Sequence, residues 1–434
     1  MVPFKTKEET LKLMYSKWTP QISEETVSID DCLGRVLAED VYAEYNIPVV
    51  RSSAMDGIAV KSSAFFDEET GEEKTPDTEN WVLGQDYVRA DTGDDFDDAF
   101  DAVIAIEMVE LLENGGVRLD LNRPAGPGPR RPGGPEDHKG PKDGEKPGHG
   151  PGPKGRGPHG PFKVRKDVNV RPAGSAVKKG TLLAAKGTWI RPEDIASIAM
   201  SGKNEFKVVK KPVVSFIPTG SELVPAGTDL QRGQNFNSNG PMVKAMLEQM
   251  GAEPHIMPIV KDKKSDLRTA LEKAIEVSDI VIINGGSSKG EEDFNTRMLD
   301  EMGELLSHGV AAVPGRPMGF AIINGKPVIN TSGPSVACFH GMKWCISELI
   351  NAALGIEKQP VYRRLVTLAE DLHTPPVMSR LVRLNVEETE DGPVAHQPEQ
   401  GGMAADMKTN AMFLSEIGKE YPAGSKIEVE MRIR

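Results

Sequence analysis

The sequence predicts a multi-domain protein of the α/β plus β class, and three features of the chain lead to it. At 434 residues the chain is too long for one ordinary core, because domains of about 150 residues are typical. One stretch alternates apolar runs with helical patterns, as in a mainly parallel sheet, and two others carry short strand patterns between turn residues. The predicted parts are a discontinuous first domain (1–42 with 168–206), a β-rich inserted domain (43–167), a central α/β domain (207–356) and a small C-terminal β domain (357–434).

The N-terminal half combines a helix with many short strands. Residues 7–18 have a helical pattern, and residues 39–122 contain brief apolar runs between turn residues. Phe162–Val170 alternates polar and apolar residues, so we expect it to pair with Val117–Leu121 as a hairpin.

The segment between these two runs, residues 123–161, has an unusual composition. It contains 12 glycines and 11 prolines but no aromatic residue and no aliphatic side chain larger than alanine. Such a stretch can bury too little surface to offset the entropy of ordering its backbone. We therefore expect a disordered Pro/Gly loop outside the fold, and a polyanion or metal tether through its three histidines is the weaker interpretation.

The central domain alternates strands and helices. Val213–Ile217, Ile256–Val260 and Ile280–Ile283 read as buried strands, each followed by a helical or glycine-rich segment. Helices are expected at 241–250, after an N-cap at Ser265, and from Pro334 to about residue 354. Asn324-Gly325 predicts a hairpin turn between Ala321–Ile323 and Val328–Ile329.

Composition and charge exclude several classes of protein. The net charge of −13 argues against a general nucleic-acid binder. No apolar run reaches the roughly 18–20 residues of a membrane span, and the first residues lack the apolar core of a signal peptide. Three cysteines without metal-ligand spacing fit a reducing compartment. The expected location is therefore the cytoplasm.

Polar and glycine-bearing loops follow the predicted strands at the edge where their carboxyl ends meet. Ligands of open α/β sheets bind at this edge. Glycines allow backbone N–H groups to approach an anion, and carboxylates are ligands that Mg²⁺ prefers. Together the loops indicate a site for a phosphate and a hard cation, although each loop alone is more typical of ordinary turn structure. The loop segments are Pro218–Glu222, Asp262, Gly285–Asp293 and Thr331–Ser335.

Several segments carry characteristic motifs in a fixed order. Gly34–Val41 reads Gly-Arg-Val-Leu-Ala-Glu-Asp-Val, and Arg51–Val60 contains Ser-Ala-Met-Asp-Gly with Ile58 in place of a usual tyrosine. Similar matches occur at Pro218–Leu223, Gly285–Phe294 and Val313–Pro317. In these segments the chain resembles the molybdopterin molybdenumtransferase family, which includes bacterial MoeA and the E domain of gephyrin-type proteins. The resemblance covers the whole chain apart from residues 123–161.

This resemblance implies a central domain of the molybdopterin-binding type and a homodimer whose pocket is shared between subunits. It implies Mg²⁺-dependent insertion of molybdate into adenylylated molybdopterin with release of AMP, and contact with other cofactor-biosynthesis proteins. Asp56 and Thr92 would face the site from one subunit, and the catalytic acids Glu222, Asp262 and Asp293 would hold the metal in the other. The implied binding residues are Thr219, Gly220, Ser221, Gly285, Gly286, Ser287, Ser288, Arg316, Ser332, Gly333 and Ser335.

The pocket segments also depart from the family pattern. Ser175, Ala176 and Ser221 stand where the family has acids, and Thr331–Ala337 lacks one proline and the asparagine of the family loop. A second interpretation is therefore a non-catalytic paralogue or scaffold that binds molybdopterin. A third is another phosphate-ester enzyme that uses the α/β domain alone, because a fold does not determine a function. The retained acids favour the transferase.

Overall fold

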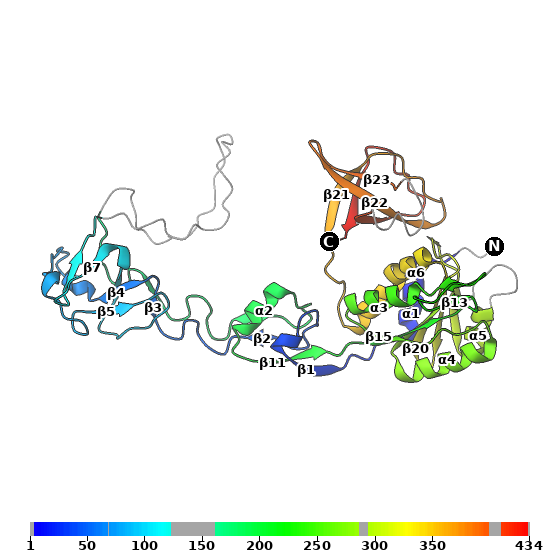
Figure 1. Ribbon diagram of the computed structural model, residues 1–434, viewed down its shortest axis with the longest axis horizontal. Coiled ribbons are helices and arrows are strands. Elements are labelled where there is room, and N and C mark those ends of the chain that lie inside the picture. Colours follow the sequence, from blue (N-terminus) through cyan, green and yellow to red (C-terminus); the bar gives the residue numbers. More distant parts are fainter. Residues whose placement is uncertain (1–3, 68, 123–160, 286–293, 399–408, 433–434) are drawn as a thin grey trace. The chain divides into compact units, whose positions relative to one another are not determined.

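The computed structural model describes residues 4–67, 69–122, 161–285, 294–398 and 409–432 (Figure 1). The α/β plus β class is confirmed, while the four-part domain division stays a prediction. The Pro/Gly segment predicted at 123–161 lies outside the described residues except for Pro161. The chain divides into two compact units: unit 1 is Met1–Asp40, Ala185–Ile195 and Asn204–Arg434, and unit 2 is Val41–Ala184 and Ala196–Lys203.

Unit 2 is built from short antiparallel strands. Its largest sheet has the order β5-β4-β6, and Ile58 and Ile104 lie fully buried in the core beside it. The pairs β2–β10, β3–β9 and β7–β8 are its other sheets. The strands are β2 (Val41–Tyr42), β3 (Ser52–Ser53), β4 (Gly57–Val60), β5 (Tyr87–Ala90), β6 (Ala102–Ala105), β7 (Val109–Leu111), β8 (Val117–Leu119), β9 (Val170–Arg171) and β10 (Leu182–Ala184).

The hairpin predicted between Val117–Leu121 and Phe162–Val170 is wrong. Strand β8 pairs with β7, whose chain returns through a tight turn closed by the Leu112 N–H and the Gly116 carbonyl at 2.9 Å. A partner this close in sequence costs little loop-closure entropy, so it displaces a distant one. Of the predicted pairing, one bond remains, from the Phe162 N–H to the Leu121 carbonyl at 2.8 Å.

Unit 1 begins with a well-capped helix. Helix α1 (Lys7–Lys17) starts at Thr6, whose side chain accepts from the Glu9 N–H while the Glu9 carboxylate accepts from the Thr6 N–H. This capping box satisfies two backbone donors that the helix would otherwise leave unpaired. Strand β1 (Glu24–Ser28) then pairs with β11 (Glu205–Val209), and helix α2 (Pro192–Ala199) contains the boundary between the units.

The central sheet has the order β15-β12-β16-β20-β19-β17, and its first four strands are parallel. The predicted hairpin is confirmed: Asn324 and Gly325 have φ of 50° and 75°, as its turn requires. The strands are β12 (Val213–Pro218), β15 (Glu253–Ile256), β16 (Ile280–Asn284), β17 (Glu304–His308), β19 (Gly319–Ile323) and β20 (Lys326–Thr331). The helices are α3 (Asn239–Gln249), α4 (Lys264–Val277), α5 (Phe294–Met302), α6 (Ser335–Gly341) and α7 (Ser347–Ala353), with a π-helical stretch at Met342–Ile346 between the last two.

Two predicted boundaries in this domain are wrong. The strand predicted at 256–260 in fact spans Glu253–Ile256, because these are the residues that pair with β12. Beyond them, only Val260 makes an isolated bridge, to Thr219. Lys263, rather than Ser265, is the N-cap residue of α4, and the Ser265 hydroxyl donates to the side chain of Asp266 instead.

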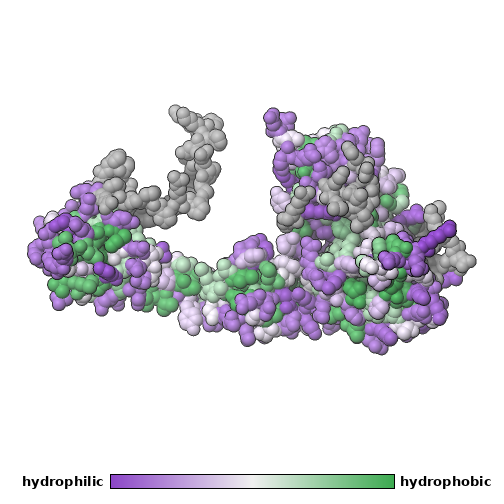
Figure 2. Space-filling view, viewed as in Figure 1, coloured by the Kyte–Doolittle hydropathy of each residue, from purple (hydrophilic) through white to green (hydrophobic). Residues whose placement is uncertain are grey.

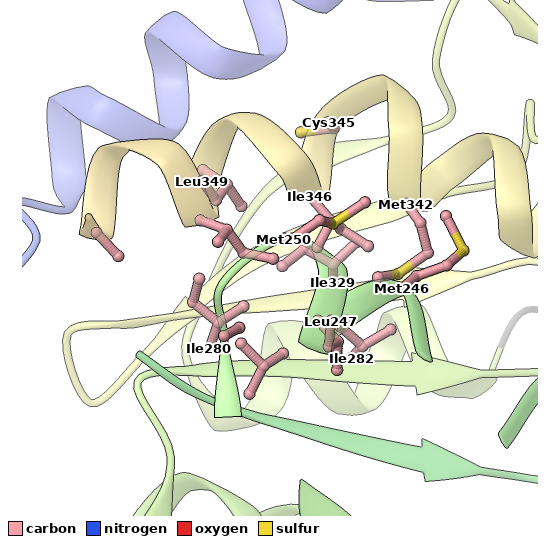
Figure 3. Packing of buried hydrophobic residues seen from close by; sticks show 14 of the residues in the cluster. Met246, Leu247, Met250, Ile280, Ile282, Ile329, Met342, Cys345, Ile346 and Leu349 are labelled. Atoms are coloured by element: carbon pink, nitrogen blue, oxygen red, sulfur yellow. The ribbon is translucent and has the colours of Figure 1, made fainter. Parts of the chain in front are cut away.

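Helices cover both faces of this sheet. Helices α1, α3, α6 and α7 pack on one face, where Met246, Leu247 and Leu349 meet residues of β16 and β20 (Figure 3). Helices α4 and α5 pack on the other, around Leu271 and Leu299. Because both faces are buried, the strands are apolar throughout, which is why the sequence shows them so clearly.

The C-terminal strands form a small closed sheet. The order is β18-β22-β23-β21-β25-β24, and a further β22–β24 pairing closes five of these strands.

The surface of the chain that is visible in Figure 2 is mainly hydrophilic. Within the described ranges, no helix combines the length and apolar character needed to cross a bilayer. The remaining strands of unit 1 are β13 (Leu223–Val224), β14 (Asn235–Phe236), β18 (Ala312–Val313), β21 (Arg363–Leu368), β22 (Ser379–Thr389), β23 (Gly392–His396), β24 (Ala411–Leu414) and β25 (Lys426–Met431).

Candidate functional site

The parallel strands of the central sheet end at one edge, where the predicted site loops lie. The loops after β12 and β20 lead to helices on one face of the sheet, and those after β15 and β16 lead to α4 and α5 on the other. In open α/β sheets, ligands bind where neighbouring loops diverge in this way.

The ends of β12 and β16 are in close backbone contact. Gly285 has φ of 114°, and a Cβ at this position would lie 2.5 Å from the Thr219 carbonyl oxygen and 2.6 Å from Thr219 Oγ1. Both the conformation and the contact require glycine. The Thr219 N–H and hydroxyl donate to the Asn284 carbonyl at 2.9 and 3.0 Å, which fixes the two loops against each other.

Two predicted acids lie on adjoining loops. The Ser221 N–H donates to Asp262 Oδ2 at 2.8 Å, and the Asp262 N–H donates to Ser221 Oγ at 3.1 Å. The Glu222 carboxylate lies over Gly220, where a Cβ would come within 2.7 Å of Oε1. Ser221 thus links the loop that carries Glu222 to Asp262. Both carboxylates are exposed and therefore accessible to a cation.

The loop after β20 is held by buried asparagines that the sequence interpretation missed. Asn239 Nδ2 donates to the Gly333 carbonyl at 2.7 Å, and Asn284 Nδ2 donates to the Ser332 carbonyl at 2.8 Å. Ser335 Oγ lies 3.0 Å from Ser238 Oγ, which ties the same loop to the start of α3. The sequence did contain a signal for them, because Asn284 ends an otherwise apolar strand and a buried amide side chain needs hydrogen-bond partners.

The loop that carries Arg316 packs on α6. A Cβ on Gly315 would lie 3.7 Å from His340 Nδ1 and 3.8 Å from the Ala337 carbonyl oxygen, and His340 Nδ1 donates to the Pro314 carbonyl. Arg316 itself is exposed, with its guanidinium 5.4 Å from the centre of the Phe4 ring. The Arg316 loop therefore packs on α6, the helix that begins at Ser335.

His340 is a buried neutral imidazole beneath this loop. Burial lowers the pKa of His340 to about 4, although the bond to the Pro314 carbonyl acts in the opposite direction and nearby Lys7 adds to the lowering. Its Nε2 is buried and finds no hydrogen-bond partner among the residues that the structure describes. His340 is thus an interior support for the loop that carries Arg316.

In unit 2 the structure brings Asp56 and Thr92 together. The Thr92 N–H and hydroxyl donate to Asp56 Oδ1 at 2.7 and 2.6 Å. These bonds, the hydroxyl first, lower the pKa of the exposed Asp56 carboxyl. Gly57 fits because a Cβ there would lie 2.0 Å from the Ile104 carbonyl oxygen. The signature around Asp56 therefore builds a hydrogen-bonded, ionised carboxylate at the protein surface.

Four predicted site residues, Gly286, Ser287, Ser288 and Asp293, lie outside the described residues. The three-acid metal set thus stays a prediction. Within the described ranges, no three His, Cys, Asp or Glu side chains gather in a way that would hold a metal ion. Glu222 and Asp262 still suit Mg²⁺, because this ion commonly binds through one or two carboxylates together with phosphate oxygens of a substrate.

Comparison with known proteins places this geometry in a family. Residues 5–202 match the family described as the MoeA N-terminal region (domain I and II), and residues 215–352 match the probable molybdopterin binding domain. A Staphylococcus aureus protein named molybdopterin molybdenumtransferase is 28% identical over 425 residues, covering 93% of this chain and 90% of the relative. The chain belongs to the MoeA family.

Further relatives extend this match over nearly the full length. A Staphylococcus epidermidis protein of the same name is 25% identical over 448 residues, covering 98% of this chain and 95% of the relative. A crystal structure of the molybdopterin biosynthesis moeA protein from Pyrococcus horikoshii OT3 has a TM-score of 0.71 at 22% identity, covering 99% of this chain and 100% of that one. The part of the chain that the structure describes therefore has the same fold as this protein.

Proposed function

We propose that this MoeA-family protein is a molybdopterin molybdenumtransferase, which inserts molybdate into adenylylated molybdopterin and releases AMP. The observation that carries the proposal is the joining of Glu222 and Asp262 to the glycine loops at one sheet edge through Ser221. The full-length match to relatives of this name supports it.

The two carboxylates would hold Mg²⁺, which neutralises charge on a phosphate when it is bound. The backbone around Gly285 and Gly333 would receive phosphate oxygens, because glycine lets a ligand approach the main chain closely. Arg316 would attract a further anion, such as molybdate. The serine that replaces a family acid at position 221 is compatible with this role, since it holds Asp262 in place.

A cavity at the same edge suits the ring portion of such a substrate. Its volume is about 530 Å³, which falls within the range of small-molecule sites. Apolar side chains with a single amide would accept a flat heterocycle and leave the charged groups to the neighbouring loops. The cavity is lined by Pro225, Ala226, Asn237, Pro241, Met257, Pro258 and Ile259.

We further propose a cytoplasmic homodimer in which Asp56 and Thr92 of one subunit complete the site of the other. Unit 2 exposes Tyr45, Val49 and Val50 to 57%, 66% and 50%, a concentration of apolar surface that an interface would cover. The three cysteines are free and buried, as expected of a protein in a reducing compartment.

The test measures AMP released from adenylylated molybdopterin with Mg²⁺, with and without molybdate, together with the molybdenum retained on the pterin. Glu222→Gln and Asp262→Asn should each lower molybdate-dependent AMP release at least about a hundredfold if they hold the metal. Glu276→Gln, which alters an exposed acid on α4, is the matched control and should leave release unchanged.

A binding protein without chemistry is the alternative, and the acids missing at Ser175, Ala176 and Ser221 favour it. It predicts tight binding of adenylylated molybdopterin by the unaltered protein with no AMP formed under any metal. AMP formation that rises with molybdate would exclude this alternative. Binding without AMP would exclude the transferase.

A further inference from the structure

Asn284 is a buried residue beneath the loops of the proposed site. It is the last residue of β16 and is 2% exposed. Its Nδ2 donates to the Ser332 carbonyl at 2.8 Å and to Thr331 Oγ1 at 3.2 Å, and its Oδ1 accepts from Asn239 Nδ2 at 2.8 Å. The side-chain amide thus joins β16, the loop after β20 and the start of α3.

These bonds determine how the next loop presents its backbone. The Ser332 carbonyl points toward Asn284, and the Gly333 carbonyl points toward Asn239 at 2.7 Å. In a trans peptide the N–H points opposite to the carbonyl of the same unit. The Gly333 N–H therefore points away from the buried amides, and among the described residues it has no protein acceptor.

Gly333 lies beside the other glycine of the proposed site. Among the residues that the structure describes, the atom nearest to a Cβ built on Gly333 is the Cα of Gly285 at 3.7 Å, so these two glycines lie next to each other. A glycine amide that points away from the buried side chains can donate to a phosphate oxygen, and hydrogen bonds to a charged acceptor are among the stronger ones.

We propose that Asn284 is a positioning residue: by holding the Ser332 carbonyl inward, it directs the Gly333 N–H at a phosphate oxygen of the substrate. The inference rests on the proposed function, because it assigns the phosphate position within that site. Without the Asn284 amide, the Ser332 carbonyl loses its hydrogen bond and the Ser332–Gly333 peptide can rotate. The Gly333 N–H then no longer points toward the phosphate oxygen. Asn239 supports the same loop but holds the following carbonyl, so it cannot replace Asn284.

The test compares the affinity of AMP, the expected product, for the full-length protein and for Asn284→Ala. We expect about tenfold weaker binding, which is the effect of losing one well-directed hydrogen bond to a phosphate. Asn351→Ala is the matched control: it removes another buried amide, about 24 Å along the helical segment from Ser335, and should leave AMP affinity within twofold.

A second measurement keeps the inference testable if Asn284→Ala does not fold. In protein labelled with ¹⁵N-glycine, the Gly333 resonance is assigned by its absence from Gly333→Ala and followed while AMP is added. A large shift in the unaltered protein supports the inference, and no shift overturns it. A loss of folding stability alone would not move this resonance.

The outcomes separate the two proposals. If the unaltered protein binds neither AMP nor adenylylated molybdopterin, the proposed function fails and the inference falls with it. If the unaltered protein binds both and Asn284→Ala binds AMP equally well, only the inference is overturned.

Discussion

Replacing His340 by glutamine tests how a buried imidazole couples the folding of unit 1 to pH. In the folded chain burial lowers the pKa of His340 to about 4, against 6.5 for an ordinary histidine. The unfolded chain therefore binds a proton between these values that the folded chain does not bind. It follows that the contribution of neutral His340 to stability is complete above pH 6.5 and is lost as the pH falls toward 4.

The magnitude follows from the two pKa values. When the pH falls from 8 to 5, protonation of His340 in the unfolded chain lowers the free energy of unfolding by roughly 2 kcal/mol. Glutamine binds no proton in this range, so His340→Gln removes the pH-dependent part. Other groups titrate in both proteins and cancel in the difference.

The assay is urea unfolding at pH 8 and pH 5, followed by tryptophan fluorescence in a Trp81→Phe background. The remaining tryptophans, Trp18, Trp189 and Trp344, all belong to unit 1. We expect the unaltered protein to lose roughly 2 kcal/mol more than His340→Gln over this interval. Equal losses would show that the imidazole takes up its proton in the folded state and would refute the reasoning.

Three further predictions address the glycines and Asp56. Gly57→Ala should destabilise unit 2 by about 3 kcal/mol or more, because its Cβ would meet the Ile104 carbonyl oxygen at 2.0 Å; an unchanged melting temperature, read from Trp81 fluorescence, would contradict this. Thr92→Val should raise the pKa of Asp56 toward its ordinary value, since the hydroxyl bond is lost while the N–H bond remains; ¹³C NMR titration decides, and an unmoved pKa counts against it. Gly285→Ala should weaken AMP binding at least about tenfold, because φ of 114° strains alanine and the loop must shift; calorimetry that finds unchanged affinity would exclude the backbone contact.

Some elements could be predicted from the sequence because local patterns are sufficient for them. The strands at 213–217 and 280–283 are buried on both faces, so an unbroken apolar run identifies each one. Strand β17 was missed, because Glu304–His308 is a half-exposed edge strand of mixed polarity without that signal. Helix α5 was missed for another reason, since we interpreted the segment before it as one long glycine loop.

The glycine loops of the site could also be located, since they follow recognisable strands. The hydrogen bonds that hold these loops in place could not be predicted. They join pairs such as Asn239 with Asn284 and Ser221 with Asp262, which lie 45 and 41 positions apart in the sequence. No periodicity connects such residues. Only the parallel pairing of β12, β15 and β16 brings their ends to one edge.

The sequence by itself determined the fold class, the family resemblance and the residue types available at the sheet edge. It did so because apolar periodicity and turn chemistry are local properties of the chain. The tertiary structure decided which of these groups cooperate: the asparagine amides behind the loops, the serine that holds Asp262 and the neutral histidine beneath the Arg316 loop. These roles arise from burial and from the direction of hydrogen bonds, and both exist only after distant segments have packed.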